Sequence, residues 1–178
     1  MKKTAILIAI FLAPMVASAQ NAFDSFENDK DVSSVVVTKN MFKLLSKIDM
    51  QSDDPEVQEY KALVENLDNI KVYTTENPDV ASKMNAAVAS YVSKSKGLDE
   101  LMRVNDDGNN IKFYSKEGSN ENFVSELLMH LQGDVEGKNM TVIMSITGNI
   151  DLKQISKLTK DLNVPGSDAL KEVGNKKQ

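Results

Sequence analysis

The sequence contains no cysteine and no tryptophan, and it has a single histidine among its 178 residues. Without cysteine the chain has no disulfide, no thiolate nucleophile, no cysteine-ligated metal site and no lipid-modified N-terminal cysteine. One histidine cannot supply a multi-histidine metal centre. The sequence therefore predicts neither a metal ion nor a cofactor.

Positive charge is also scarce, since 21 Lys and Arg stand against 26 Asp and Glu, for a formal net charge of −5. Proteins that bind nucleic acid as their main partner are usually basic, because they must neutralise phosphates. This balance predicts no nucleic-acid partner and leaves an unidentified protein or small molecule as the partner class.

The N-terminus has the three parts of a secretory signal peptide in the right order. Lys2 and Lys3 are followed by the apolar stretch Thr4–Val16 and then by the small residues Ala17–Ala19. The apolar stretch is shorter than the roughly 20 residues that a spanning helix needs, which disfavours the alternative of an uncleaved anchor. Cleavage after Ala19 removes two lysines and leaves 159 residues with net charge −7. No later stretch could span a membrane, so we expect a periplasmic or secreted protein.

The remaining chain has the length of one ordinary domain. We expect a leader at residues 1–19, a single domain at residues 20–165 and a polar C-terminal tail at residues 166–178. The segment before the first strand looks loose, although Phe23 and Phe26 can fix it to the domain as a short helical turn.

The first half of the domain alternates between strand and helix patterns. Strands are predicted at Val32–Thr38 and Asn69–Thr75, and helices at Lys39–Ile48, from Pro55 to Leu67, and from Pro78 towards Lys96. Asn77 and Pro78 form a cap-then-proline signal for the start of the last helix. The side chains expected on the buried faces of these helices are Met41, Leu44, Leu45 and Ile48; Val57, Tyr60, Leu63, Val64 and Leu67; and Val80, Met84, Ala87, Val88 and Tyr91.

The second half changes to a strand pattern. Strands are predicted at Glu100–Asn105, Ile111–Lys116, Asn122–Leu131 and Asn139–Thr147, followed by a helix at Asp151–Leu162. We expect an α+β fold with a mostly antiparallel sheet of about five or six strands and helices packed on one face. Its C-terminal part is then a four-stranded meander followed by a helix.

The second face of this sheet is predicted to be partly solvated and to carry the polar partners of the alternating strands. It provides candidates for contact with a ligand, and an ordinary wet sheet face explains the same pattern slightly better. The ligand-facing candidates are Tyr73, Arg103, Lys112, Tyr114, Glu126 and His130.

Four segments resemble the secreted bacterial family catalogued as domain of unknown function 4252. They are NMFKLLSKI (Asn40–Ile48), NIKVYTTE (Asn69–Glu76), FVSELLMHLQGD (Phe123–Asp134) and the run Ser145–Leu152. The resemblance implies a small exported protein. Some members are encoded near extracytoplasmic-function sigma factors, which implies an accessory role in envelope sensing. It brings no catalytic residue.

The Gly148–Leu152 segment reads as a strand-to-helix junction, with Gly148 ending the strand and Asp151 capping the helix. Phosphate binding at such a junction is disfavoured, because the loop has one glycine and Asp151 would repel an anion. The acidic run Asp106–Asn110 lacks calcium-loop spacing and predicts a hairpin turn instead. The methionines, Met41 and Met140 among them, are expected to fill the core and not to bind copper.

The sequence leaves two biochemical function classes open, and a purely structural role is a third possibility. The favoured one is a non-enzymatic binding or interaction module in the cell envelope. The alternative is a hydrolase or lyase that uses carboxylates and His130, with Glu126 as the orienting partner, although no nucleophile motif is present. The third is an assembly role through an exposed edge strand.

Overall fold

The computed structural model describes residues 22–48, 55–106, 108–120, 123–135, 137–152 and 154–155. The predicted leader, the predicted C-terminal tail and most of the predicted final helix lie outside these ranges. The side chains of Leu45, Ile48 and Tyr60 also lie outside the described set.

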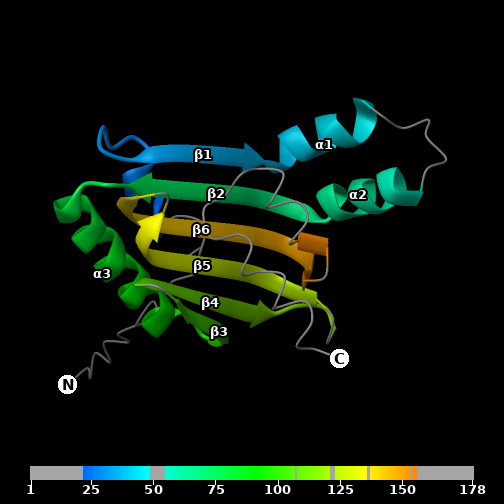
Figure 1. Cartoon of the computed structure of the whole chain (residues 1–178). Coiled ribbons are helices and arrows are strands. Elements are labelled where there is room, and N and C mark those ends of the chain that lie inside the picture. Colours follow the sequence, from blue (N-terminus) through cyan, green and yellow to red (C-terminus); the bar gives the residue numbers. More distant parts are fainter. Residues whose placement is uncertain are drawn as a thin grey trace, which may run out of the picture.

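Six strands form one antiparallel sheet with the order β1-β2-β6-β5-β4-β3 (Figure 1). This arrangement confirms the predicted α+β class with an antiparallel sheet. The strands are β1 (Ser33–Thr38), β2 (Leu67–Thr75), β3 (Leu98–Asp106), β4 (Asn109–Glu117), β5 (Phe123–Val135) and β6 (Lys138–Asp151). The described helices are α1 (Lys39–Ile48), α2 (Pro55–Glu65), α3 (Pro78–Lys94) and the short 3-10 turn Asp24–Phe26.

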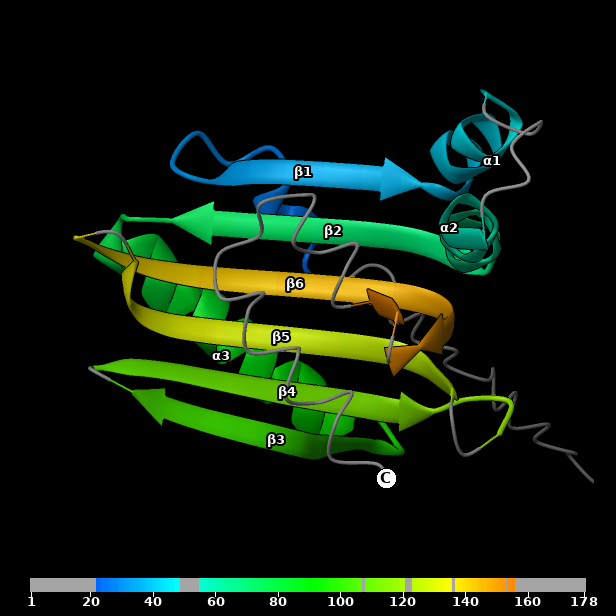
Figure 2. The same cartoon turned by 45° about the vertical axis from the view of Figure 1, so that its right-hand side comes forward.

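Helix α3 crosses one face of the sheet, whereas α1 and α2 lie beyond the ends of β1 and β2 (Figures 1 and 2). We call the side covered by α3 the helix face and the other side the opposite face. The strand register places Tyr73, Ile143, His130, Lys112 and Arg103 in one cross-strand row on the helix face. The next rows follow at intervals of two residues, because side chains alternate along a strand.

Apolar cores lie on both faces. The larger one, on the opposite face, contains Ile70, Phe113, Met129 and Met144 and receives Phe42 from α1. Leu63 and Val64 of α2 extend the same core. The predicted apolar alternation of the strands is therefore right for this face, but the helices are not confined to one face.

The helix face is also buried, and the prediction that it is partly solvated is wrong. Val80, Met84 and Val88 of α3 pack there against Leu128 and Ile143. In the sequence, this face of each strand has a mixed polar and apolar pattern. Leu128 lies between Glu126 and His130, and Ile143 lies between Thr141 and Ser145. The helical periodicity correctly predicted which side chains of α3 are buried. They pack on the face of the sheet that was expected to be solvated.

The N-terminal turn completes this second core. Phe23 and Phe26 are buried, and their rings meet Tyr91 and Tyr73 edge to face at centroid distances of 5.4 and 6.5 Å. Lys71 Nζ donates to Asp24 Oδ1 at 2.5 Å, which fixes the same turn to β2. The suggested role of the two phenylalanines is thus confirmed.

Helix α1 buries Phe42, which was not predicted, and exposes two of the four side chains that were predicted to be buried. Phe42 is 2% exposed, whereas Met41 and Leu44 are 48% and 56% exposed. The periodicity was consistent with more than one apolar stripe, and the wide aromatic ring takes the inward position.

Gly148 does not end a strand, contrary to the prediction, since β6 continues to Asp151. Its φ is +143°, and a Cβ there would overlap the carbonyl oxygen of Asn66. Asn149 N also donates to Asn66 O at 2.8 Å. The glycine therefore permits the close approach of the α2–β2 junction to β6. Asp151 is the last residue of the strand, and Leu152, Gln154 and Ile155 after it are helical, at the place where the sequence predicts a helix.

Candidate functional site

Helix α3 begins at a junction that joins three segments distant in the sequence. Asn77 Oδ1 accepts hydrogen bonds from the backbone N–H groups of Asp79 and Val80 at 2.9 and 3.3 Å, as an N-cap does. Thr75 Oγ1 donates to the carbonyl oxygen of Asp31 at 2.7 Å and accepts from Asn77 N at 3.1 Å. The end of β2, the start of α3 and the segment before β1 are thereby held together.

A polar groove lies at this junction, in two adjoining hollows that share Glu76 and Met140. One hollow, of about 420 Å³, lies between α3 and the start of β6. The other, of about 530 Å³, lies towards the segment before β1. Lys138 Nζ donates to Glu76 Oε1 at 2.8 Å beside them. The residues lining the first hollow are Glu76, Pro78, Ala81, Ser82, Asn85, Asn139, Met140 and Thr141; those lining the second are Lys30, Asp31, Val32, Ser33, Thr74, Thr75, Glu76, Asn77 and Met140.

Asn85 connects the groove to the histidine. Its Oδ1 lies 2.8 Å from Nε2 of His130, which is 7% exposed and is not a lining residue of either hollow. Burial lowers the pKa of His130 to about 4, and the positive charge of Lys112 adds to the effect. The imidazole is therefore neutral near pH 7, and its Nε2–H donates to the Asn85 oxygen.

A second polar pair lies further along α3. The Tyr91 hydroxyl donates to the carboxylate of Glu126, at 2.7 Å from Oε1 and 3.0 Å from Oε2. Burial raises the pKa of Glu126, against the opposing effects of the Tyr91 hydrogen bond and the Lys116 charge. Burial and the contact with Glu126 raise the pKa of Tyr91. Both pairs join α3 to β5 through hydrogen bonds.

The six predicted ligand-facing residues share the helix face, but most of them are covered. Tyr73, Tyr114, Glu126 and His130 are buried, which excludes the solvated position predicted for them. Burial, followed by the charges of Asp24 and Glu27, raises the pKa of Tyr73 to about 12. Two cationic candidates lie nearer the edge: Arg103 is exposed and donates to Glu100 at 2.7 Å, and Lys112 is half-buried.

His130 and Glu126 were predicted to act together as base and orienter, and the structure gives each a separate partner on α3. His130 contacts Asn85, and Glu126 contacts Tyr91. These hydrogen bonds hold Nε2 of His130 and both carboxylate oxygens of Glu126 towards α3. Among the hydrogen bonds of the described residues, none joins His130 to Glu126 directly.

The groove itself was missed at the sequence level. One signal was available: Asn85 interrupts the apolar stretch of α3 directly after Met84, at a position close to the buried stripe. A polar side chain there requires a partner. The placement of α3 over the sheet decides that this partner is His130. It also decides that Ser82 and Thr141 line the groove together with Asn85.

Within the described parts of the chain, no group of three or more His, Asp or Glu side chains could hold a metal ion. Among the helices described, none combines the length and the apolar character needed to cross a membrane.

The sequence profile of the family described as Domain of unknown function (DUF4252) matches residues 26–158. No curated protein and no solved structure matches the chain. The matched range contains the whole sheet, α3 and the groove, so the family relationship covers the structure described above.

Proposed function

The chain belongs to the DUF4252 family, a domain of unknown function, and on that premise we propose that it is an exported, non-enzymatic binding module of the cell envelope. We propose further that the polar groove contacts the bound partner. One observation supports this proposal most directly: Asn85 lines the groove, and His130, which is hydrogen-bonded to Asn85, does not. The groove offers side-chain amides and hydroxyls for hydrogen bonding, while the imidazole that could act as a base lies behind them.

The lining chemistry favours a polar, largely uncharged ligand surface. Ser82, Asn85, Asn139 and Thr141 can each donate or accept a hydrogen bond. Of the two acidic groups, Glu76 is paired with Lys138, and Asp31 accepts a hydrogen bond from the side-chain amide of Asn77. Peptide backbone and hydroxyl-bearing ligands are the classes that such groups recognise.

Site-specific photo-crosslinking tests the groove. A photoreactive residue at Ser82 lies in the groove, and one at Ser93 is the matched control on the exposed side of the same helix. We expect a discrete adduct with an envelope component from position 82 that is absent from position 93. Equal labelling at both positions, or labelling at neither, would contradict the assignment.

Export is tested separately. The leader predicts a product that begins at Gln20 and is found outside the cytoplasm, and an Ile8→Arg change in its apolar stretch is expected to block export. Cell fractionation with intact-mass measurement checks both. Full-length protein retained in the cytoplasm would overturn this part of the proposal.

The family resemblance also implies a sensing role, in which binding of the partner in the groove would regulate an envelope response. It is supported by that resemblance alone, and a stress-reporter assay in cells lacking the protein tests it. We expect an altered reporter response, which an Asn85→Asp/Ser82→Asp variant does not restore. An unaltered response in cells lacking the protein would contradict a sensing role.

The hydrolase or lyase alternative has a direct test. A panel of chromogenic esters, glycosides and phosphodiesters should give no turnover. Turnover that is lost in a folded His130→Gln variant would replace the binding proposal.

A further inference from the structure

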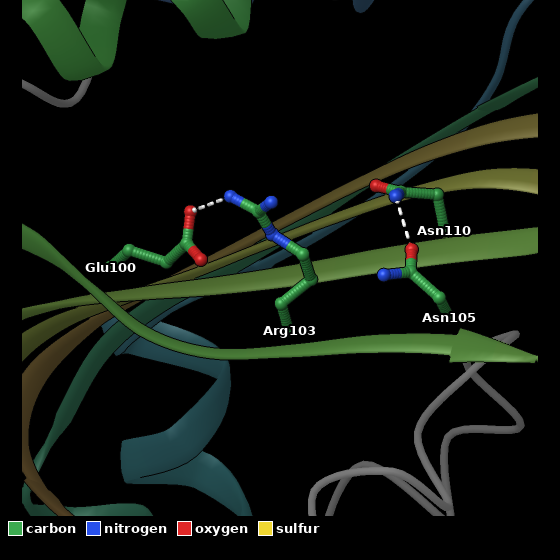
Figure 3. Close-up of polar contacts among 4 residues, drawn as sticks. All are labelled: Glu100, Arg103, Asn105 and Asn110. Atoms are coloured by element: carbon green, nitrogen blue, oxygen red, sulfur yellow. Dashed lines mark hydrogen bonds and ion pairs between the residues drawn. The ribbon is translucent and has the colours of Figure 1, made fainter.

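The two edges of the sheet are built differently. The edge strand β3 carries Asp99, Glu100, Arg103 and Asp106, and its register with β4 shifts between Glu100 and Met102. Glu100 and Arg103 form an ion pair near this edge, and Asn105 bonds with Asn110 (Figure 3). Charged side chains and irregular register are features by which natural edge strands avoid pairing with other chains.

The edge strand β1 has none of these features. Its sequence, SSVVVT, contains no charged residue and no proline, and its register with β2 is continuous. Four consecutive residues, Val35–Thr38, are β-branched and favour strand pairing. Within the described residues, β2 is the only strand paired with β1.

Exposed apolar side chains gather at the same edge. Among the described residues, the large hydrophobic side chains that are exposed are Val35 on β1 and Met41 and Leu44 on α1. They are 51%, 48% and 56% exposed, and α1 follows β1 without a loop. In the described part of the chain, this edge therefore combines a strand that has no second strand partner with an apolar surface.

The charges that flank β1 have opposite signs at its two ends. The segment before it contains Glu27, Asp29 and Asp31 with one lysine, Lys30. The helix after it contains Lys39, Lys43 and Lys47 and no acidic residue, and Lys39 forms an ion pair with Asp68 of β2 at 2.5 Å. The flank as a whole keeps an excess of positive charge. In an antiparallel pair of β1 strands, the acidic flank of each copy lies beside the basic flank of the other.

We propose that β1 is a self-association edge, on which a second copy of this chain docks with its own β1 in antiparallel orientation. A two-fold axis through the middle of the strands joins the two sheets into one and covers the exposed Val35. The acidic flank and the basic flank that would meet both belong to this chain. A second copy therefore fits this edge better than an unrelated strand does. The proposal is independent of ligand binding in the groove.

The oligomeric state of the exported form tests the proposal, by sedimentation over a concentration series. A dimer is expected for the natural sequence. Val35→Lys places like charges close together across the axis and should weaken dimerisation at least tenfold. The matched control, Asn105→Lys, adds the same charge to the β3 edge and should leave the dimer intact. A monomer at every concentration, or equal effects of the two variants, would overturn the proposal.

A charge exchange separates a lost interface from a misfolded variant. Lys39→Glu and Asp31→Lys should each weaken self-association, because each places like charges together at both ends of the paired strands. An equimolar mixture should form a mixed dimer, in which both ends are again oppositely charged. Failure of the mixture to associate, with both variants folded by circular dichroism, would contradict the antiparallel arrangement. Dimers built through another surface would keep their affinity in both single variants, and that result would also overturn the proposal.

Discussion

At the scale of single residues, the distinctive feature is that α3 is joined to β5 by two buried polar pairs. His130 with Asn85 and Glu126 with Tyr91 place titratable groups between an amphipathic helix and a sheet. The sequence predicted that Glu126 and His130 share a face of one strand, which is correct. Their separate partners could not be predicted, because the rotation and position of α3 over the sheet decide which helix residue reaches each of them.

The first prediction concerns pH. The pKa of His130 is lowered from 6.5 to about 4 in the folded chain. Between these values the unfolded chain binds a proton that the folded chain does not, so stability falls as the pH is lowered through this window. We expect a loss of at most about 3 kcal/mol from this group. Denaturant unfolding across the window measures it.

A His130→Gln variant supplies the control for this effect, since glutamine keeps a donor for Asn85 but does not titrate. Its stability should change less between about pH 6.5 and pH 4 than that of the natural sequence. Glu126, whose pKa is raised, acts in the opposite direction as the pH falls and is present in both proteins. Identical pH profiles would exclude His130 as the cause.

The second prediction concerns the buried carboxylate. Tyr91→Phe removes the hydroxyl that donates to both oxygens of Glu126. We expect a loss of about 1.5–3 kcal/mol, because a charged group is left buried without this donor. The pKa of Glu126 should rise further, which a carboxyl-resolved NMR titration would show. Ser93→Ala on the exposed side of α3 should change stability by less than about 0.5 kcal/mol.

At the scale of the elements, the start of α3 was predicted closely and the end of β6 was not. Asn77 and Pro78 are a local signal whose physics acts within one helical turn, so the sequence sufficed. Gly148 was recognised as special, but the partner that requires a glycine is the backbone at Asn66, far away in the chain. A close approach between distant segments leaves no local pattern from which the partner can be identified.

The third prediction is a loss of helix capping. Asn77→Ala removes the acceptor for the backbone N–H groups of Asp79 and Val80 and should cost about 0.5–2 kcal/mol. Thermal or denaturant unfolding measures the loss. Asn77→Asp keeps the cap and should retain most of the stability. An alanine variant as stable as the aspartate variant would show that the cap contributes nothing measurable.

The fourth prediction uses two glycines with positive φ. Gly148→Ala should destabilise the fold by more than about 2 kcal/mol, because the new Cβ meets backbone and the alanine is strained at this φ. Gly137 has φ of +83°, and a Cβ added there would meet no other atom within 4 Å. Gly137→Ala should therefore show only the smaller conformational cost, and unfolding curves of the two variants would separate the effects.

At the scale of the whole molecule, apolar cores lie on both faces of one sheet, and the N-terminal turn belongs to the core on the helix face. The strand alternation predicted the apolar side of the sheet, because Ile70, Met129 and Met144 follow a simple period of two. It failed for the other side, where α3 buries a mixed set of polar and apolar residues. A mixed face looks solvated in the sequence, and only the docking of a helix shows that it is not.

The fifth prediction concerns the N-terminal boundary of the domain. A chain that begins at Gln20 should keep full stability, whereas one that begins at Glu27 loses Phe23 and Phe26 from the core. Each buried phenylalanine contributes about 3–5 kcal/mol, so the shorter chain should be severely destabilised. Unfolding midpoints of the two chains measure the difference. Equal midpoints would show that the turn is dispensable.

The charges and the irregular register of the β3 edge limit the size of any assembly that this chain forms. Sheets that can add neighbours at both sides extend without limit into fibrils, because each new unit exposes another site like the one it filled. Here the register shift and the charges of β3 leave β1 as the edge suited to pairing. Once two copies have met, the outer strands of the pair are both β3, and the assembly is finite.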